Sequence, residues 1–292
     1  MSSFHASPVK TLMFGLVILL CAMTPAASAP VQVGIAATVV GDVRRSNTAI
    51  KKPIKIPRRQ RLAWGDTLTT KGKSKLQILL LDRSTLTIGS NARLVINRFV
   101  YDPTKERSLG ATVSKGAFRF MSGRKTKKSS ASVQSSVGTI GIRGTAVDGV
   151  VGKEAVKIAK NEPFLDGVES DKDTATLVVL RGPGPNRSGD LDVGLVDVSA
   201  AGRTVRLDQP ILAAYIPEPG AEPIGPFLLS ANGLSKLQDL LAPRVTNANK
   251  SSLLNKLLPA AAIGIGLGLL LPGSGGDDGG DRCVGPNAAG AC

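Results

Sequence analysis

The sequence is poor in the side chains that enzymes most often use for nucleophilic and metal chemistry. Its 292 residues include one histidine and three cysteines. The histidine, His5, and one of the cysteines, Cys21, lie within residues 1–29, which have the pattern of a secretory signal peptide. Removal of that segment leaves no imidazole, which excludes Ser-His-Asp and Cys-His nucleophile systems and histidine-based zinc sites. We therefore expect no cofactor, no metal site and no catalytic residue.

The amino-terminal residues predict export from the cytoplasm. Lys10 gives a positive start, residues 12–22 form an apolar run, and residues 24–29 are mostly small, as signal peptidase requires. The apolar run is shorter than the roughly 20 residues that span a bilayer, which favours a cleaved signal peptide over an uncleaved anchor. We expect a periplasmic or cell-envelope location.

Few candidates for chemistry remain in the exported part. Cys283 and Cys292 are too few for a thiolate cluster, and in an oxidising compartment they are the pair that would close a small carboxyl-terminal disulfide loop. A hydrolase that uses only carboxylates remains an alternative, because glycosidases need just two acids. However, Asp and Glu total 22 against 37 Lys and Arg, and no two acids are singled out by their spacing. The sequence therefore favours a protein that is not an enzyme.

Acidic residues are scarce, and the excess of cations is unevenly placed. The formal net charge is +15, and the cations concentrate in residues 44–61, 71–75 and 124–128. In an exported protein such clusters suggest an envelope protein, an anionic polymer or a lipid surface as partner. The alternative is a set of solvated strand edges, where lysine discourages aggregation. Aromatic residues make up 3% and are absent from the clusters, which argues against nucleic acid. The candidate contacts are Arg58, Arg59, Arg61, Arg124, Lys125, Lys127 and Lys128.

The chain also lacks long helical patterns in residues 30–151, where short apolar runs alternate with polar residues. Leu86 and Ile88 would share one face of a strand, as would Phe118 and Phe120. This spacing predicts a half-buried sheet, built as a twisted antiparallel sheet or as a solenoid-like roll. Residues 152–175 are polar and irregular, and we expect a loop or an insertion there.

Strand signals return over residues 176–215, which are expected to complete the domain. Residues 194–198 and 204–207 flank Ala-Ala-Gly and predict a hairpin. Residues 216–252 then read as a proline-rich linker followed by a short helix, with leucines at helical spacing at positions 234, 237 and 241. The predicted class is all-β with a short helical region near the carboxyl terminus.

The last part of the chain contains an apolar segment, residues 253–272, and a Gly/Asp-rich tail, residues 273–292, which we expect to be flexible. Within the apolar segment, residues 257–271 include the glycine pair Gly264 and Gly268, whose spacing suits close helix contact in a membrane. The segment is short for a bilayer span and contains Pro259, so a buried or interfacial helix is the alternative.

Several motifs resemble the FecR domain in both their order and their spacing. They are Gly41-Asp42-Val43, Leu62-Ala63-Trp64-Gly65-Asp66-Thr67-Leu68-Thr69-Thr70, Leu76-Gln77-Ile78-Leu79-Leu80-Leu81-Asp82, Leu86-Thr87-Ile88-Gly89-Ser90-Asn91-Ala92 and Val137-Gly138-Thr139-Ile140-Gly141-Ile142-Arg143-Gly144-Thr145-Ala146-Val147-Asp148. The resemblance covers residues 38–151, and its most specific piece is residues 141–145.

Physical reasoning gives the motif residues a structural role before a binding role. Glycine readily adopts a positive φ, so Gly65 would permit a turn, and Gly141 and Gly144 would permit a bend or a close approach of two strands. We expect the motif residues mainly to hold the domain together, with a direct ligand contact by Arg143 or Asp66 as the alternative. The motif residues concerned are Trp64, Gly65, Asp66, Gly141, Arg143, Gly144 and Thr145.

The resemblance implies a periplasmic sensing module, similar to that of FecR-type regulators, which pass a signal from an outer-membrane transporter to a cytoplasmic sigma factor. Those regulators carry a cytoplasmic anti-sigma segment and a central membrane helix, and the predicted signal peptide takes that place here. The sequence thus predicts a free-standing module that binds an envelope protein or polymer. The alternative is a structural envelope component tethered by residues 257–271.

Overall fold

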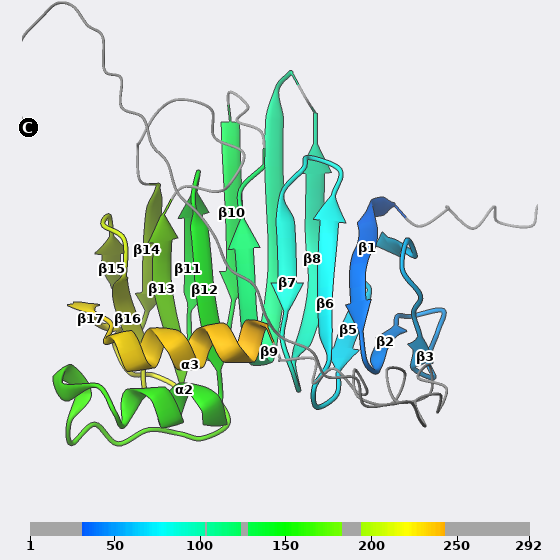
Figure 1. The fold of residues 1–292 in the computed structure, drawn as a ribbon. Coiled ribbons are helices and arrows are strands. Elements are labelled where there is room, and N and C mark those ends of the chain that lie inside the picture. Colours follow the sequence, from blue (N-terminus) through cyan, green and yellow to red (C-terminus); the bar gives the residue numbers. More distant parts are fainter. Residues whose placement is uncertain (1–30, 103, 124–127, 183–193, 243–292) are drawn as a thin grey trace, which may run out of the picture. The chain divides into compact units, whose positions relative to one another are not determined.

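The computed structural model describes residues 31–102, 104–123, 128–182 and 194–242. These residues form a mostly β structure, as the alternation of apolar residues predicts (Figure 1). The signal peptide, the apolar segment, the tail, and Cys283 and Cys292 lie outside the described residues, so the predictions about them stand as predictions.

The strands are arranged as two sheets that share one long strand, β9 (Glu106–Met121). Sheet 1 has the order β4 (Arg61–Ala63), β1 (Gln32–Val40), β6 (Lys75–Leu80), β7 (Thr85–Ile88), β9, β12 (Ala146–Val151), β13 (Thr176–Gly182), β16 (Leu212–Ile216) and β17 (Ile224–Leu228). Sheet 2 has the order β3 (Ile54–Lys55), β2 (Val43–Ser46), β5 (Thr67–Thr70), β8 (Arg93–Tyr101), β9, β10 (Lys128–Gln134), β11 (Thr139–Arg143), β14 (Leu195–Ala200) and β15 (Arg203–Leu207).

Strand β9 passes from sheet 2 to sheet 1 at Gly116. Residues before this point pair with β8 and β10, and residues from Gly116 onward pair with β7 and β12. Gly116 has φ 85°, and a Cβ at this position would lie 2.6 Å from the Cα of Ala92. Glycine is therefore required where the strand bends away from the β7–β8 connection.

The hydrophobic core lies between the two sheets and is built from alternate residues of each strand. Leu86, Ile88, Phe118 and Phe120 are fully buried in it, which confirms the faces predicted from the sequence. Their polar neighbours, such as Thr87 and Arg119, point to the other face of sheet 1.

The predicted hairpin after residue 194 is also confirmed. Strands β14 and β15 pair from Val196 with Leu207 to Ala200 with Arg203. The two residues between them, Ala201 and Gly202, both have positive φ, as a tight turn matched to strand twist requires.

Two helices and a 3-10 turn pack on the outer face of sheet 1, where α2 and α3 lie across one end of the strands (Figure 1). Helix α3 (Ala231–Leu241) forms where leucine spacing predicts it, and Leu237 and Leu241 are buried against the sheet. Ser230 caps it by accepting a hydrogen bond from the Gly233 amide at 3.0 Å. Ser230 also donates to the buried carboxylate of Glu162 at 2.7 Å, which ties the start of α3 to the preceding helical segment.

Residues 152–175 differ from the loop or insertion that their polarity predicts. They contain α2 (Lys153–Ala159) and the 3-10 helix η2 (Pro163–Leu165). Ala155, Val156, Ile158 and Ala159 occur at helical spacing and are buried, while the lysines between them face solvent. Residues 216–252 also differ in part, because β17 forms inside the proline-rich linker and pairs with β16.

Candidate functional site

The motif around Trp64 builds a turn, as predicted. The Asp66 amide donates to the Ala63 carbonyl at 3.2 Å, and Gly65 between them has φ 83°. This turn leads directly into β5, which begins at Thr67. Trp64 is held at its ring edge, because its Nε1 donates to the Asn97 carbonyl on β8, yet 44% of the residue remains exposed.

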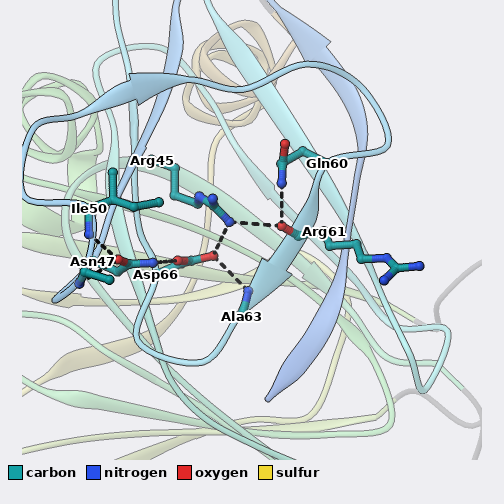
Figure 2. A network of polar contacts seen from close by, with 8 residues as sticks. Arg45, Asn47, Ile50, Gln60, Arg61, Ala63 and Asp66 are labelled. Atoms are coloured by element: carbon teal, nitrogen blue, oxygen red, sulfur yellow. Dashed lines mark hydrogen bonds and ion pairs between the residues drawn. The ribbon is translucent and has the colours of Figure 1, made fainter. Parts of the chain in front are cut away.

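Asp66 is fully buried and is the centre of a polar network (Figure 2). Its carboxylate accepts hydrogen bonds from the Ala63 amide at 2.8 Å and from Asn47 Nδ2 at 2.8 Å. Arg45 Nη1 lies 3.5 Å from the same carboxylate and 3.1 Å from the Arg61 carbonyl. The network joins β2, the loop that follows it and β4, which supports the structural role expected for Asp66.

The second motif, residues 141–145, is spread over several environments. Gly144 has φ 67°, so it needs glycine, whereas a Cβ on Gly141 would meet nothing closer than the Asp197 carbonyl at 3.7 Å. Thr145 is fully buried, and its amide donates to Ser122 Oγ at 3.1 Å while its hydroxyl donates to the Gly182 carbonyl. These bonds connect the ends of β9, β12 and β13.

Arg143 is the exposed member of this motif. Its side chain is 66% exposed on the outer face of sheet 2, and its Nη2 lies 3.3 Å from Asp197 Oδ2. Arg206 on β15 bonds the other oxygen of Asp197 at 2.9 Å, and this bond raises the pKa of Arg206. Arg143 is therefore available to a partner on this face, although the structure does not bring it near Asp66 or Trp64.

The buried acids of the described residues all have internal partners. Asp148 in β12 accepts two bonds from Arg119, at 2.6 and 2.7 Å, and Arg181 lies 3.4 Å away. The bond to Asp148 raises the pKa of Arg119. Asp82 bonds Ser84 and lies 3.3 Å from Arg107, with both members of that ion pair almost fully buried.

Asp82 and Asp148 lie in the FecR motif pieces, but sequence reasoning assigned neither of them a role, and it did not single out Glu162. The signal that could have found Asp148 is an acid inside an apolar strand, Ala146-Val147-Asp148-Gly149-Val150, because a buried carboxylate needs a cationic or hydrogen-bonding partner. Within the part of the chain that the structure describes, no three His, Cys, Asp or Glu residues lie together as metal ligands.

The exposed cations show the opposite arrangement, because they gather where acids are absent. Residues 43–65 contain no Asp or Glu. We use the name cationic corner for the six exposed cations of this stretch, Lys51, Lys52, Lys55, Arg58, Arg59 and Arg61. Within the described residues, none of the six forms an ion pair.

The backbone of the cationic corner is anchored even though its side chains are exposed. Ile56 is buried in the core, and its amide donates to the Val43 carbonyl at 3.1 Å. The Arg59 amide donates to the Ala36 carbonyl at 2.8 Å, and Arg58 Nε donates to the Ala37 carbonyl at 3.3 Å. In Figure 2 the Arg61 side chain points away from the Asp66 network.

The structure joins two of the three cation clusters predicted from sequence. Asp42 lies beside Arg44, whose guanidinium bonds it at 2.9 and 3.1 Å and, with the charges of Lys55 and Lys71, holds the pKa of Asp42 below its usual value. Lys55 belongs to the cationic corner and Lys71 to the second cluster, so the two adjoin at Asp42. The third cluster cannot be compared in this way, since Arg124, Lys125, Lys127 and the Lys128 side chain lie outside the described residues.

Part of the chain is similar to a known protein family. Residues 66–182, from the buried aspartate to the end of β13, match the family model described as FecR protein. The chain carries a FecR domain. The FecR domain is a sensing or regulatory module rather than a catalytic one.

Among solved structures, the chain is similar to two crystal structures of a "putative anti-sigma factor" from Parabacteroides distasonis, determined at 1.65 and 2.50 Å resolution. Each is 12% identical, with a TM-score of 0.35, and the alignment covers 54% of this chain and 57% of that chain. This chain thus spans little more than half the length of the structures it matches. No curated protein matches the sequence. None of the described helices is both long and apolar enough to cross a bilayer.

Proposed function

We propose that this FecR-domain protein is a non-enzymatic binding or sensing module of the bacterial cell envelope, where it recognises an anionic envelope polymer, lipid surface or partner protein. The predicted signal peptide supports the location. The family supports sensing rather than catalysis.

The observation that carries the proposal is that the buried acids are bound within the chain, whereas the cations of the cationic corner are exposed and form no ion pair among the described residues. The buried acids, Asp66, Asp82, Asp148 and Glu162, are bound by groups of the same chain. The cations of the cationic corner form no ion pair among the described residues, and they are exposed to solvent on an anchored backbone. Charges of one sign that are clustered and unpaired attract oppositely charged surfaces and speed association with them.

Sedimentation with isolated envelope fragments tests the proposal. The wild-type protein should bind at low salt and release as salt rises, because screening weakens contacts between exposed charges. The variant K51Q/K52Q/R58Q/R59Q removes four positive charges from the cationic corner and should lose most of this binding.

A control variant removes the same charge elsewhere. K153Q/K157Q/K160Q/K172Q changes four exposed lysines on or beside α2, away from the cationic corner, and should bind nearly as well as the wild type. Absence of binding at low salt, or equal loss in the two variants, would contradict the proposal.

A further inference from the structure

Large apolar side chains are exposed at the margin of the cationic corner. Val31, Ile54 and Trp64 are 55%, 45% and 44% exposed, although the fold has a well-filled core that buries most residues of their kind. An exposed apolar group rimmed by charges is a mark of an interaction surface, whereas an isolated one needs no explanation.

Backbone contacts place these three side chains around the same elements. The Trp64 amide donates to the Val31 carbonyl at 3.0 Å, so the two residues are neighbours. Ile54 on β3 is the cross-strand partner of Arg45, and Arg45 in turn bonds the Arg61 carbonyl at 3.1 Å. Arg45 of the Asp66 network thus links the strand that carries Ile54 to Arg61 of the cationic corner, and Figure 2 shows its bonds to Asp66 and to the Arg61 carbonyl.

A further exposed apolar residue, Leu79, lies on sheet 1 on the same face as Arg61. Ile35 on β1 is the register partner of both Arg61 on β4 and Leu79 on β6, and directly opposed residues point to the same face of a sheet. Leu79 is 39% exposed. Helices α2 and α3 pack on the same outer face of sheet 1 but over β9, β12 and β13, away from β4 and β1 (Figure 1).

We propose that the cationic corner, together with Trp64, Ile54 and Leu79, docks on the surface of a bilayer that contains anionic lipids. This inference rests on the proposed function and names the partner. Lysine and arginine would contact the lipid phosphates, and the exposed apolar groups would enter the headgroup region, where tryptophan is favoured. A soluble polyanion could use the cations but would gain nothing from the exposed apolar groups, so a lipid surface accounts for both observations.

Trp64 supplies a direct test, because it is the only tryptophan of the chain. The purified wild-type protein is mixed with vesicles of phosphatidylcholine and phosphatidylglycerol, and with vesicles of phosphatidylcholine alone. We expect the emission of Trp64 to shift to shorter wavelength and to be protected from acrylamide only with the anionic vesicles. Binding without a change in Trp64 emission, as residues 257–271 alone would give, overturns the proposal.

Variants separate the charge contribution from other causes. Each cation near an anionic surface strengthens binding about fivefold, so K51Q/K52Q/R58Q/R59Q should bind vesicles at least about a hundredfold more weakly. The control K153Q/K157Q/K160Q/K172Q should shift Trp64 emission as the wild type does. Equal weakening of the two variants counts against the proposal.

Soluble polyphosphate distinguishes this inference from the function on which it rests. If the wild-type protein binds polyphosphate through the cationic corner but does not bind anionic vesicles, the lipid surface is wrong while recognition of an anionic partner stands. If it binds neither, both proposals fail.

Discussion

At the scale of single residues, the polar side chains of the FecR motifs serve the fold more than they serve a partner. Asp66 has no exposed surface and receives its hydrogen bonds from three separate segments. Thr145 is likewise enclosed. Arg143 is a polar motif residue that a ligand could reach, since its side chain is largely in solvent.

Replacement of Asp66 by alanine should therefore act through stability. The change leaves Arg45, Asn47 and the Ala63 amide without their buried acceptor, and we expect a loss of about 3 kcal/mol in the free energy of unfolding. Urea unfolding followed by Trp64 fluorescence measures it. Asp42→Ala is the control, because its pair with Arg44 is partly open to solvent and its loss should change the midpoint much less. Comparable losses in the two variants would contradict this assignment.

Tyr215 should make the stability of the folded state decrease at alkaline pH. Burial raises the pKa of the Tyr215 phenol above its ordinary value of 10.0, with Ser170 opposing the shift. The unfolded chain thus loses this proton first as pH rises, so the contribution to stability is complete below pH 10 and declines above it. Tyr215→Phe should lose less stability than the wild type between neutral pH and about pH 11, as thermal unfolding would show. Parallel pH profiles would be the contrary result.

At the scale of elements, the strands were predictable and their partners were not. Period-two alternation placed the buried faces correctly in β7 and β9, because that pattern is local. Pairing of β9 with β10, β12, β7 and β8 joins segments far apart in the chain, and no local pattern encodes it. Helix α2 was missed because its lysines and glutamate hide a short apolar face.

The sequence also does not show which glycines the fold requires. Gly141 was singled out because it lies in a FecR motif. A Cβ at this position, however, would make only ordinary van der Waals contacts. Gly116 lies outside the most specific motif pieces but is constrained by both its positive φ and the neighbouring backbone of Ala92. The difference depends on tertiary contacts that the sequence does not display.

Gly116→Ala should consequently destabilise the protein more than Gly141→Ala. We expect about 2 to 4 kcal/mol for the first, from backbone strain and the close approach to Ala92, and less than about 1 kcal/mol for the second. Chemical denaturation of the two variants side by side tests this order. A reversed order would mean that β9 does not bend at Gly116 as described.

At the scale of the whole molecule, the exposed surface is rich in positive charge because several acidic residues are buried and pair with groups inside the fold. The sequence revealed the basic clusters, but it could not show that the first two adjoin at Asp42 or that exposed apolar groups border them. Those facts depend on how β2, β3 and β4 fold around Asp66. The candidate surface was thus predicted in part, by its cations alone.

Crowding of like charges should make the stability of the protein depend on salt. Added salt screens repulsion within the cationic corner, so the wild type should become more stable to heat as ionic strength rises from low to moderate values. The variant K51Q/K52Q/R58Q/R59Q should start with a higher melting temperature in low salt and respond less. Scanning calorimetry at several concentrations of sodium chloride provides the measurement, and an unchanged response in the variant would disprove the repulsion.

The sharing of β9 by both sheets also bears on how the domain comes apart. Each half of this strand is paired on both sides, with β8 and β10 before Gly116 and with β7 and β12 from Gly116 onward, so exposing it to solvent requires both neighbouring strands to separate from it. The amide protons of β9 should accordingly exchange with solvent only in molecules that have opened completely, and a pull on either sheet is transmitted along a single peptide segment to the other.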